Sequence, residues 1–292
     1  MKLDIKDIAK AVGADTSCLA DATITTLLTD SRSLSAPVES TLFFALRTAA
    51  NDGHRYIGQL YDKGVRNFVV SHRPDNADTL FSDANFIVAA DPLAVLHKLA
   101  AANRRASGAE VVAIAGSRGK TFVKEWLFQA LGASGRRIAR SPRSFNSQIG
   151  TALSLMEIAS DTDLAIIEAG ISQPGEMERL EHMIAPTIGI FTNLLADHAE
   201  GFPGGDPQKC AEKALLFKGC RCIVFNADCP IAAEALAKAA APGCELIGWS
   251  LTGSQEARIR FSSAPDGEGR SRFGLSMPDG SSTSVTLPYT AS

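Results

Sequence analysis

The sequence contains no hydrophobic run that could cross a membrane, because no stretch approaches the roughly 20 apolar residues that a spanning helix needs. It also lacks a large charge of either sign, since 29 basic and 32 acidic side chains leave a formal net charge of −3 over 292 residues. Such a balance gives no support for a nucleic-acid partner or for binding to an anionic membrane surface. We therefore expect no nucleic-acid and no membrane partner.

The cysteines do not form a recognisable metal site. Cys220, Cys222 and Cys229 lie close together in the sequence, but they lack C-x-x-C spacing and a matching pair of histidines. The first residues are charged and follow a helical period, so they do not resemble a signal sequence. Six cysteines without a secretion signal indicate reduced thiols. The sequence therefore predicts a soluble cytoplasmic protein.

The length of the chain favours two domains, at roughly 100–200 residues for each domain. In residues 1–106, short helical and strand patterns alternate. The helical patterns cover residues 4–12, 56–65 and 92–106, and the strand patterns cover residues 41–47, 67–71 and 85–91. The small, polar segment 104–110 is the predicted linker to a second domain that spans residues 107–292.

The second domain has the pattern of a doubly wound α/β fold. Residues 111–116 form a continuous apolar run, which is typical of a parallel strand buried on both faces, and residues 121–135 have an amphipathic helical pattern. Helical stretches alternate with further strand patterns at residues 164–170, 187–193 and 221–228. The last forty residues change to strand patterns at 257–263, 272–277 and 285–289, separated by turns. Because no further helix follows, we expect an incomplete domain and hence a fragment.

The strongest chemical signal is a glycine-containing turn between the first strand and the first helix of this domain, Gly116-Ser117-Arg118-Gly119-Lys120-Thr121. In such a turn the backbone amides point into one concavity, and the helix N-terminus adds partial positive charge. Lys120 would add a point charge, and Thr121 would place a hydroxyl on Mg²⁺. Ile114 stands where the full pattern has another glycine, so a turn that merely caps a helix is the alternative. The short motif in this context predicts a nucleotide phosphate site.

Other polar residues follow the predicted strands. Glu168 ends a strand, where a carboxylate could hold Mg²⁺ or its waters, although a solvated glutamate is the alternative. Taken singly, His198 indicates a surface or capping histidine, Lys213 a solvated helix lysine and Asn226 a turn residue. These three residues therefore carry no functional prediction by themselves.

The order and spacing of several motifs make the chain similar to Mur ligases of the MurF type. This family adds D-Ala-D-Ala to the UDP-MurNAc-tripeptide precursor of peptidoglycan. The resemblance covers essentially all 292 residues. The residues that make up its motifs are most similar to those in the ligase half of fused MurF–alanine racemase proteins. The motifs that carry it are TDSR (29–32), LFFALRTAANDGHRYI (42–57), GSRGKT (116–121), SFNSQIG (144–150), IIEAGISQPGEME (166–178), TNLLADHAEGF (192–202), AEKALLF (211–217) and FNAD (225–228).

The resemblance implies two binding regions. Ser31 and Arg32 would lie at the uridine-diphosphate site of a UDP-MurNAc-binding domain, residues 1–106. Gly116 to Thr121 would hold the ATP phosphates and Mg²⁺ in the central ligase domain. Asn146 and Asn226 match asparagines on the nucleotide side of that domain.

The resemblance also implies a second metal site and a set of catalytic residues. Glu168 and His198 match the acid and the histidine that hold a second metal ion. Lys213 matches the lysine that is carbamoylated in several members of the family. Lys120, His198 and Lys213 are therefore the expected catalytic residues, with Thr121, Glu168 and His198 as metal ligands.

The reaction that the resemblance implies runs through an acyl phosphate. The terminal carboxylate of the UDP-linked tripeptide attacks the γ-phosphoryl group of ATP, and the amine of D-Ala-D-Ala then displaces phosphate. Arg118 departs from the small or amide residue usual at its position. The third ligase domain and the racemase half have no counterpart in this chain, so we expect it to bind nucleotides without ligating.

Two other interpretations remain open at this point. The chain could belong to another ligase of the superfamily, such as a MurE-type enzyme or a folylpolyglutamate synthase, although the latter usually lacks the first domain. It could also be a non-catalytic nucleotide-binding module. Intact Lys120, Glu168, His198 and Lys213 favour an enzyme over a module whose sites have drifted.

Overall fold

In the computed structural model the chain forms two compact units. Unit 1 comprises Met1–Gly108 and Ala152–Asp161, and unit 2 comprises Ala109–Thr151 and Thr162–Ser292. The structure describes residues 2–48, 51–194, 201–254, 257–266 and 268–288. No helix within these ranges is long and apolar enough to cross a lipid bilayer.

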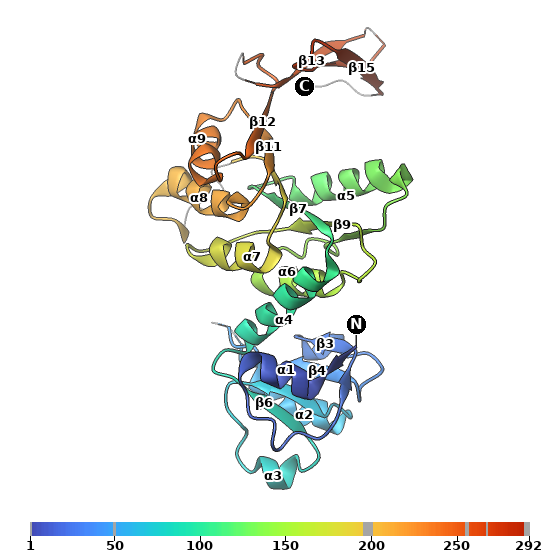
Figure 1. The fold of residues 1–292 in the computed structure, drawn as a ribbon, viewed down its shortest axis with the longest axis vertical. Helices are drawn as coiled ribbons and strands as arrows, with labels where there is room; N and C mark the ends of the chain where they lie inside the picture. The colour runs from blue at the N-terminus through green and yellow to red at the C-terminus, as the bar shows by residue number, and fades with distance from the viewer. Residues whose placement is uncertain (1, 49–50, 195–200, 255–256, 267, 289–292) are drawn as a thin grey trace. The chain divides into compact units, whose positions relative to one another are not determined.

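Unit 1 is a small α/β unit (Figure 1). Its elements are β1 (Leu3–Asp4), α1 (Ile5–Val12), β2 (Thr23–Ile24), β3 (Thr26–Leu28), η1 (Ser31–Ser33), β4 (Thr41–Phe44), η2 (Gly53–Tyr56), α2 (Ile57–Asp62), β5 (Asn67–Val70), α3 (Ala77–Leu80), β6 (Asn85–Val88) and α4 (Pro92–Ser107). Strands β3, β4, β5 and β6 form a parallel sheet in that order, and β1 pairs antiparallel with β2. The predicted helices and strands of this region are therefore confirmed, with shorter strands.

Aromatic packing holds the sheet of unit 1 together. All four residues of β4 and all four of β5 are buried, as expected for central parallel strands. The Phe68 ring lies 5.4 Å from the Phe86 ring in a stacked pair and 6.4 Å from the Phe43 ring in an edge contact. These three rings join neighbouring strands β4, β5 and β6 across one core.

The boundary between the two units falls at Gly108–Ala109, within the predicted linker 104–110, but much of that segment is helical. Helix α4 begins where the Asp91 side chain accepts the Leu93 amide, and it continues to Ser107, so four residues of the expected linker are helical. Gly108 ends the helix in the left-handed conformation, and β7 begins at Glu110. Arg104 is buried in the last turn of α4. The helix thus ends one residue after the predicted 92–106 pattern, and the connection from α4 to β7 is only Gly108 and Ala109.

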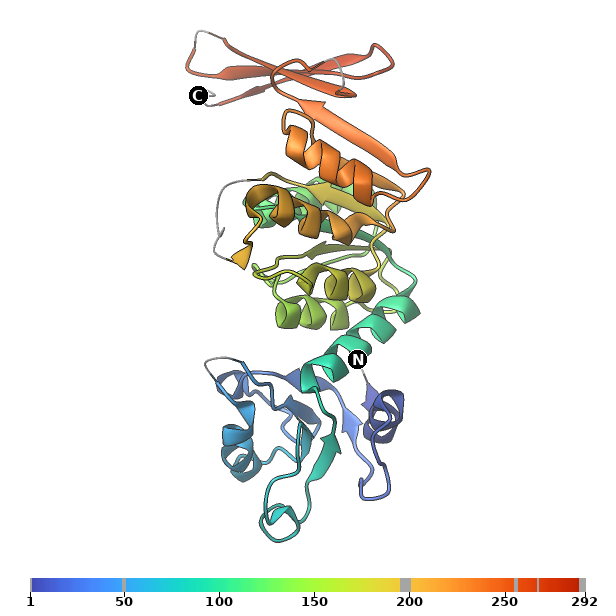
Figure 2. The same cartoon turned by 90° about the vertical axis from the view of Figure 1, so that its left-hand side faces the viewer.

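Unit 2 is built on one sheet (Figures 1 and 2). Along the chain its elements, together with α6, are β7 (Glu110–Ala115), α5 (Lys120–Leu131), η3 (Gly132–Ser134), β8 (Ile138–Arg140), α6 (Gln148–Met156), β9 (Leu164–Glu168), α7 (Glu176–Ile184), β10 (Ile188–Phe191), α8 (Gly205–Ala214), η5 (Leu215–Phe217), β11 (Cys222–Asn226), α9 (Pro230–Ala239), β12 (Glu245–Ser250), β13 (Ile259–Pro265), β14 (Ser271–Ser276) and β15 (Ser282–Leu287). Nine strands pair within the described residues, in the order β8-β9-β7-β10-β11-β12-β13-β14-β15.

Both faces of this sheet are covered, as the doubly wound prediction requires. Ile188 and Ile190 of β10 pack in the same cluster as Leu127 of α5. The alternate residue Phe191 points to the opposite face, where its ring meets Phe217 of η5 at 6.4 Å. Side-chain alternation therefore places α5 on one face and η5 on the other, and the predicted α/β fold is confirmed.

The order of the strands places a switch point at β7. From β7 the chain first builds β8 and β9 on one side and then β10, β11 and β12 on the other, all in parallel. At such a point the loops after neighbouring strands diverge and leave a crevice at the carboxyl ends. The glycine turn of residues 116–119 leaves β7 at this point.

The end of the chain adds an antiparallel meander, as the turn and strand patterns predict. Strand β13 pairs with β12 only at Trp249–Ile259 and Ser250–Arg260, whereas β13, β14 and β15 pair along six residues each. The sequence patterns missed β8 and β12. Strand β8 has only three residues, too few for a period to show, and β12 takes its strand character from pairing with β11.

Candidate phosphate-binding site

The turn after β7 is fixed by glycine. Gly116 has φ +136°, and a Cβ atom added there would lie 2.1 Å from the Thr192 hydroxyl oxygen, so only glycine fits. Gly119, at φ +81°, precedes the first residue of α5. The turn therefore joins β7 directly to the N-terminus of a helix, as predicted from its sequence.

The turn is anchored to the segment that follows β10. The Ser117 amide donates to the Asn193 carbonyl at 2.9 Å, and the Arg118 amide donates to the Asn193 side-chain oxygen at 2.9 Å. The Thr192 hydroxyl donates to the Arg118 carbonyl at 2.7 Å. The expectation that every amide of the turn faces a ligand is therefore wrong for residues 117 and 118. The N–H groups at the start of α5, which have no acceptor inside the helix, stay oriented for an anion.

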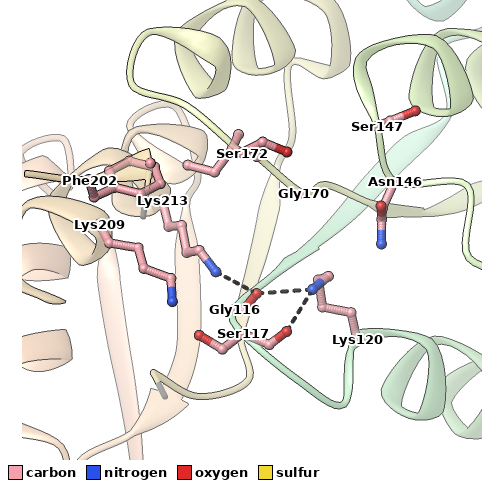
Figure 3. A pocket seen from close by; sticks show the side chains of 12 residues that line it. Gly116, Ser117, Lys120, Asn146, Ser147, Gly170, Ser172, Phe202, Lys209 and Lys213 are labelled. Carbon is pink, nitrogen blue, oxygen red and sulfur yellow. Dashed lines mark hydrogen bonds between the residues drawn. The ribbon is translucent and has the colours of Figure 1, made fainter. Parts of the chain in front are cut away.

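A pocket of about 410 Å³ opens beside the turn (Figure 3). All of its described lining residues belong to unit 2. They come from the turn and the start of α5, from the segment before α6, from the segment after β9 and from α8 with the residues that precede it. The lining comprises Gly116, Ser117, Lys120, Asn146, Ser147, Gly170, Ile171, Ser172, Gly201, Phe202, Lys209 and Lys213.

Three lysines face this pocket (Figure 3). The Lys120 Nζ donates to the carbonyls of Gly116 and Ser117, each at 3.0 Å, and the Lys213 Nζ donates to the Gly116 carbonyl at 2.8 Å. Lys213 and Lys209 are only 5% and 3% exposed. Sequence analysis missed Lys209, although its place four residues before Lys213 on one helix puts both side chains on the same face.

The ionisation of Lys120 reflects its surroundings. Burial lowers the pKa of the Lys120 ammonium, Glu168 raises it, and the positive charge of Lys209 lowers it again. The Lys120 amino group therefore lies close enough to Glu168 and Lys209 for their charges to change its pKa. Phosphate oxygens in the pocket would stabilise the charged form of this lysine.

Glu168 lies at the end of β9 and is fully buried, so it is not the solvated strand-end residue that was the alternative. Its Oε2 accepts the Thr121 hydroxyl at 3.1 Å, and its Oε1 lies 3.0 Å from the Nζ of Lys124. Lys124 has no exposed surface, and its Nζ donates to the carbonyls of Ser141, at 2.7 Å, and Arg143. Sequence analysis missed Lys124, which sits one helical turn after Lys120.

The residues around Glu168 suit a magnesium ion that also binds phosphate. The Glu168 Oε1 makes an ion pair but has no hydrogen-bond partner, and the Thr121 hydroxyl oxygen lies beside the other carboxylate oxygen. Among the described residues no group of three or more His, Cys, Asp or Glu side chains gathers to hold a metal ion. Mg²⁺ needs no such group, because it usually takes one or two carboxylates and completes its shell with water and substrate phosphates.

Of the two asparagines predicted at the nucleotide site, only Asn146 is among the described residues that line the pocket. Asn146 lines the pocket, and its side chain lies 3.2 Å from where a Cβ of Gly170 would be. Asn226 ends β11, where its side-chain oxygen accepts the Asp228 amide at 2.8 Å, and it is absent from the described lining. His198 lies outside the described residues. The geometry therefore joins Gly116, Ser117, Lys120, Asn146 and Lys213 around one pocket, with Glu168 bonded to Thr121 next to Lys120. Asn226 is not among the described lining residues.

Ser31 and Arg32 lie in the short helix η1 of unit 1. The Arg32 guanidinium makes a two-pronged pair with Asp30, from Nε to Oδ1 at 2.9 Å and from Nη2 to Oδ2 at 2.6 Å. The Asp30 carboxylate also accepts the Arg32 amide at 3.0 Å. Hydrogen bonds from the Arg32 side chain and backbone lower the pKa of Asp30 to about 2. Asp30 thus holds the exposed Arg32 side chain in one orientation.

An Arg32→Gln substitution is expected to raise the pKa of Asp30 toward its ordinary value. The folded-state pKa is lowered, so the pair stabilises the fold above the ordinary pKa and loses its effect as the pH falls toward 2. The free energy of unfolding at neutral pH should hardly change, because exposed ion pairs contribute little. NMR titration of the Asp30 carboxyl measures the shift. Arg47→Gln, which removes the partner of Asp52, is the matched control, and an unchanged Asp30 pKa in Arg32→Gln contradicts the role of the guanidinium.

Comparison with known proteins identifies relatives of this arrangement. The family model described as the Mur ligase middle domain matches residues 114–290. The Escherichia coli protein named UDP-N-acetylmuramoyl-tripeptide--D-alanyl-D-alanine ligase is 32% identical over 212 residues, which cover 72% of this chain and 44% of that protein.

Solved structures share the fold. The crystal structure of MurF from Acinetobacter baumannii matches with a TM-score of 0.84 and 21% identity, over 99% of this chain and 61% of that one. MurF ligase from Thermotoga maritima, solved in complex with ADP, matches with a TM-score of 0.75 and 20% identity, over 89% of this chain and 57% of that one. The chain spans about two fifths of the length of the curated relatives it matches.

Proposed function

Since the chain belongs to the Mur ligase family and is of its MurF type, we propose that this protein is an ATP-dependent ligase that joins D-Ala-D-Ala to UDP-MurNAc-tripeptide in peptidoglycan synthesis. The observation that carries the proposal is the pocket of unit 2, where a glycine turn, a helix N-terminus and Lys120 meet beside Glu168. The names of the curated relatives favour this substrate pair over that of a MurE-type enzyme.

The pocket is suited to the phosphate chain of ATP. Backbone amides at the start of α5 and the Lys120 amino group offer donors and positive charge from one side. The related structure from Thermotoga maritima is in complex with ADP, which supports a nucleotide in this role. Lys120 would neutralise the charge that spreads over the oxygens of the transferred phosphoryl group.

Thr121 would hold the Mg²⁺ of the ATP phosphates, and Glu168 with His198 would hold a second metal ion. These ions would supply charge that offsets the negative charge of the phosphates. The ion pair and hydrogen bonds of Glu168 keep its carboxylate at the end of β9. Carbamoylation of Lys213, which would give that side chain a negative charge, is part of the proposal as well.

The remaining chemistry follows from this positioning. A peptide carboxylate attacks the γ-phosphoryl group of ATP and forms an acyl phosphate as ADP leaves, and the amine of D-Ala-D-Ala then displaces phosphate to form the amide. The buried ring of Phe202 forms an apolar wall of the pocket and would limit the access of water to the acyl phosphate. Ser31 and Arg32 would bind the uridine-diphosphate end of the peptide substrate. We place the reaction in the cytoplasm, since all six cysteines are free thiols.

Calorimetric titration tests the proposal directly. The protein should bind Mg-ATP saturably and should bind UDP-MurNAc-tripeptide in a manner that UDP competes away. Replacing Mg²⁺ with EDTA should weaken ATP binding, and Glu168→Gln should reduce that dependence on magnesium. A folded protein that binds neither ATP nor the uridine nucleotide would contradict the proposed function.

A further inference from the structure

We infer that Lys209 is an additional phosphate-binding residue of this pocket, which contacts the anionic oxygens of the nucleotide polyphosphate together with Lys120. The inference rests on the proposed function and extends it, because neither the motif nor the family resemblance assigns a role to this lysine. It concerns the side of the pocket opposite the glycine turn.

The position of Lys209 supports a role in ligand binding and differs from that of an ordinary solvated lysine on a helix surface. It lies in α8, is 3% exposed and lines the same pocket as Lys120 and Lys213. In Figure 3 its amino group points toward the backbone of Gly116 and Ser117, on the side from which Lys213 also approaches. A long, charged side chain directed inward from a helix is unusual, because lysines normally extend their amino groups into water.

The charges of the pocket favour an anionic ligand. None of its described lining residues is acidic, and Lys120 and Lys209 bring two ammonium groups to it. These two like charges line the same pocket and repel each other. A polyphosphate placed between them would turn this repulsion into attraction for both groups, since each phosphate oxygen can accept a charge-assisted hydrogen bond.

The two helices that carry these lysines place them on two sides of the ligand. Lys120 opens α5, which covers one face of the sheet, and Lys209 belongs to α8, which precedes η5 on the other face. A polyphosphate held by the N-terminus of α5 would therefore have its far side toward α8. The geometry assigns Lys209 to that far side, where the motif itself provides no donor.

The test compares Lys209→Met with Lys209→Arg by calorimetry. Methionine keeps the buried stem and removes the charge, and we expect it to weaken binding of Mg-ATP and of inorganic tripolyphosphate by about tenfold or more, as loss of a charge-assisted hydrogen bond implies. Arginine should keep most of the affinity. Lys218→Met, which removes a lysine beyond the end of α8 that pairs with Glu181, is the matched control and should bind both ligands like the wild type.

The outcomes separate this inference from the proposed function. Failure of the wild type to bind Mg-ATP would overturn the proposed function before any variant is compared. Wild-type affinity for both ligands in a folded Lys209→Met would overturn only the role of Lys209. If Lys209→Met lost affinity only for UDP-MurNAc-tripeptide, that result would also overturn the role of Lys209. The lysine would then contact the peptide carboxylate instead of the polyphosphate.

A second measurement keeps the inference testable if Lys209→Met does not fold. In wild-type protein labelled with ¹⁵N-lysine, tripolyphosphate should shift the Nζ signal of Lys209, assigned by its absence in Lys209→Arg. The Lys218 signal should not move. A Lys209 signal that stays in place at saturating tripolyphosphate would exclude the contact.

Discussion

The Lys120→Ala variant of the complete enzyme is expected to lose acyl-phosphate formation while it keeps uridine-nucleotide binding nearly unchanged. Lys120 is the lysine of the glycine turn, and its Nζ lies among the carbonyls of Gly116 and Ser117 at the edge of the pocket. Removing a preorganised charge from a phosphoryl-transfer site typically costs about 10²–10³ in rate. The uridine-nucleotide site proposed at Ser31 and Arg32 belongs to unit 1 and shares no residue with the pocket.

Two measurements check this result. Calorimetry with Mg-ATP should show binding weakened at least tenfold, and trapping of the acyl phosphate should show none above background. Lys238→Ala removes an exposed lysine of α9 in the same unit and serves as the control, with wild-type behaviour expected. ATP binding or turnover within tenfold of wild type in Lys120→Ala would contradict the role assigned to this residue.

The Lys124→Met variant is expected to lose about 3–5 kcal/mol of folding stability, because it leaves the buried carboxylate of Glu168 without its counter-charge. Both side chains have no exposed surface, and their Nζ and Oε1 atoms lie 3.0 Å apart. The same change removes the donor from the carbonyls of Ser141 and Arg143, which follow β8. One substitution therefore disturbs the strand end, the helix and the edge of the sheet together.

Urea denaturation at neutral pH measures this loss. The double variant Lys124→Met, Glu168→Gln should recover part of the lost stability, because it no longer buries a lone charge. Lys238→Met, which breaks an exposed pair with Glu234, should unfold like the wild type. A Lys124→Met protein whose unfolding free energy stays within about 1 kcal/mol of wild type would show that Glu168 is not held as an ion by this lysine.

Local patterns predicted the central part of the site well. The apolar run at 111–116, the glycine turn and the following helix each produce structure from neighbouring residues, so β7, the turn and α5 lie where expected. The family resemblance added Lys213 and Asn146, which the structure places at the same pocket. His198 and Asn226 remain predictions, since His198 lies outside the described residues and Asn226 lies at the end of another strand.

Other parts of the site could not be predicted from local patterns. Lys124 and Lys209 look like solvated helix residues in sequence, because a helical period shows only which residues share a face and not what covers that face. Lys124 meets groups distant in the sequence, because its ammonium donates to the carbonyls of Ser141 and Arg143, and Lys209 shares a pocket with residues of the glycine turn.

The sequence by itself determined most of the elements, the glycine turn and the family to which they belong, because these depend on short-range periodicity, on glycine conformations and on motif order. Only the tertiary structure decided that two amides of the turn bond to Asn193, that Glu168 is paired with a buried lysine, and that a third lysine faces the pocket. The physical reason is that charge and burial at the switch point arise from strands and helices that meet there from distant parts of the chain.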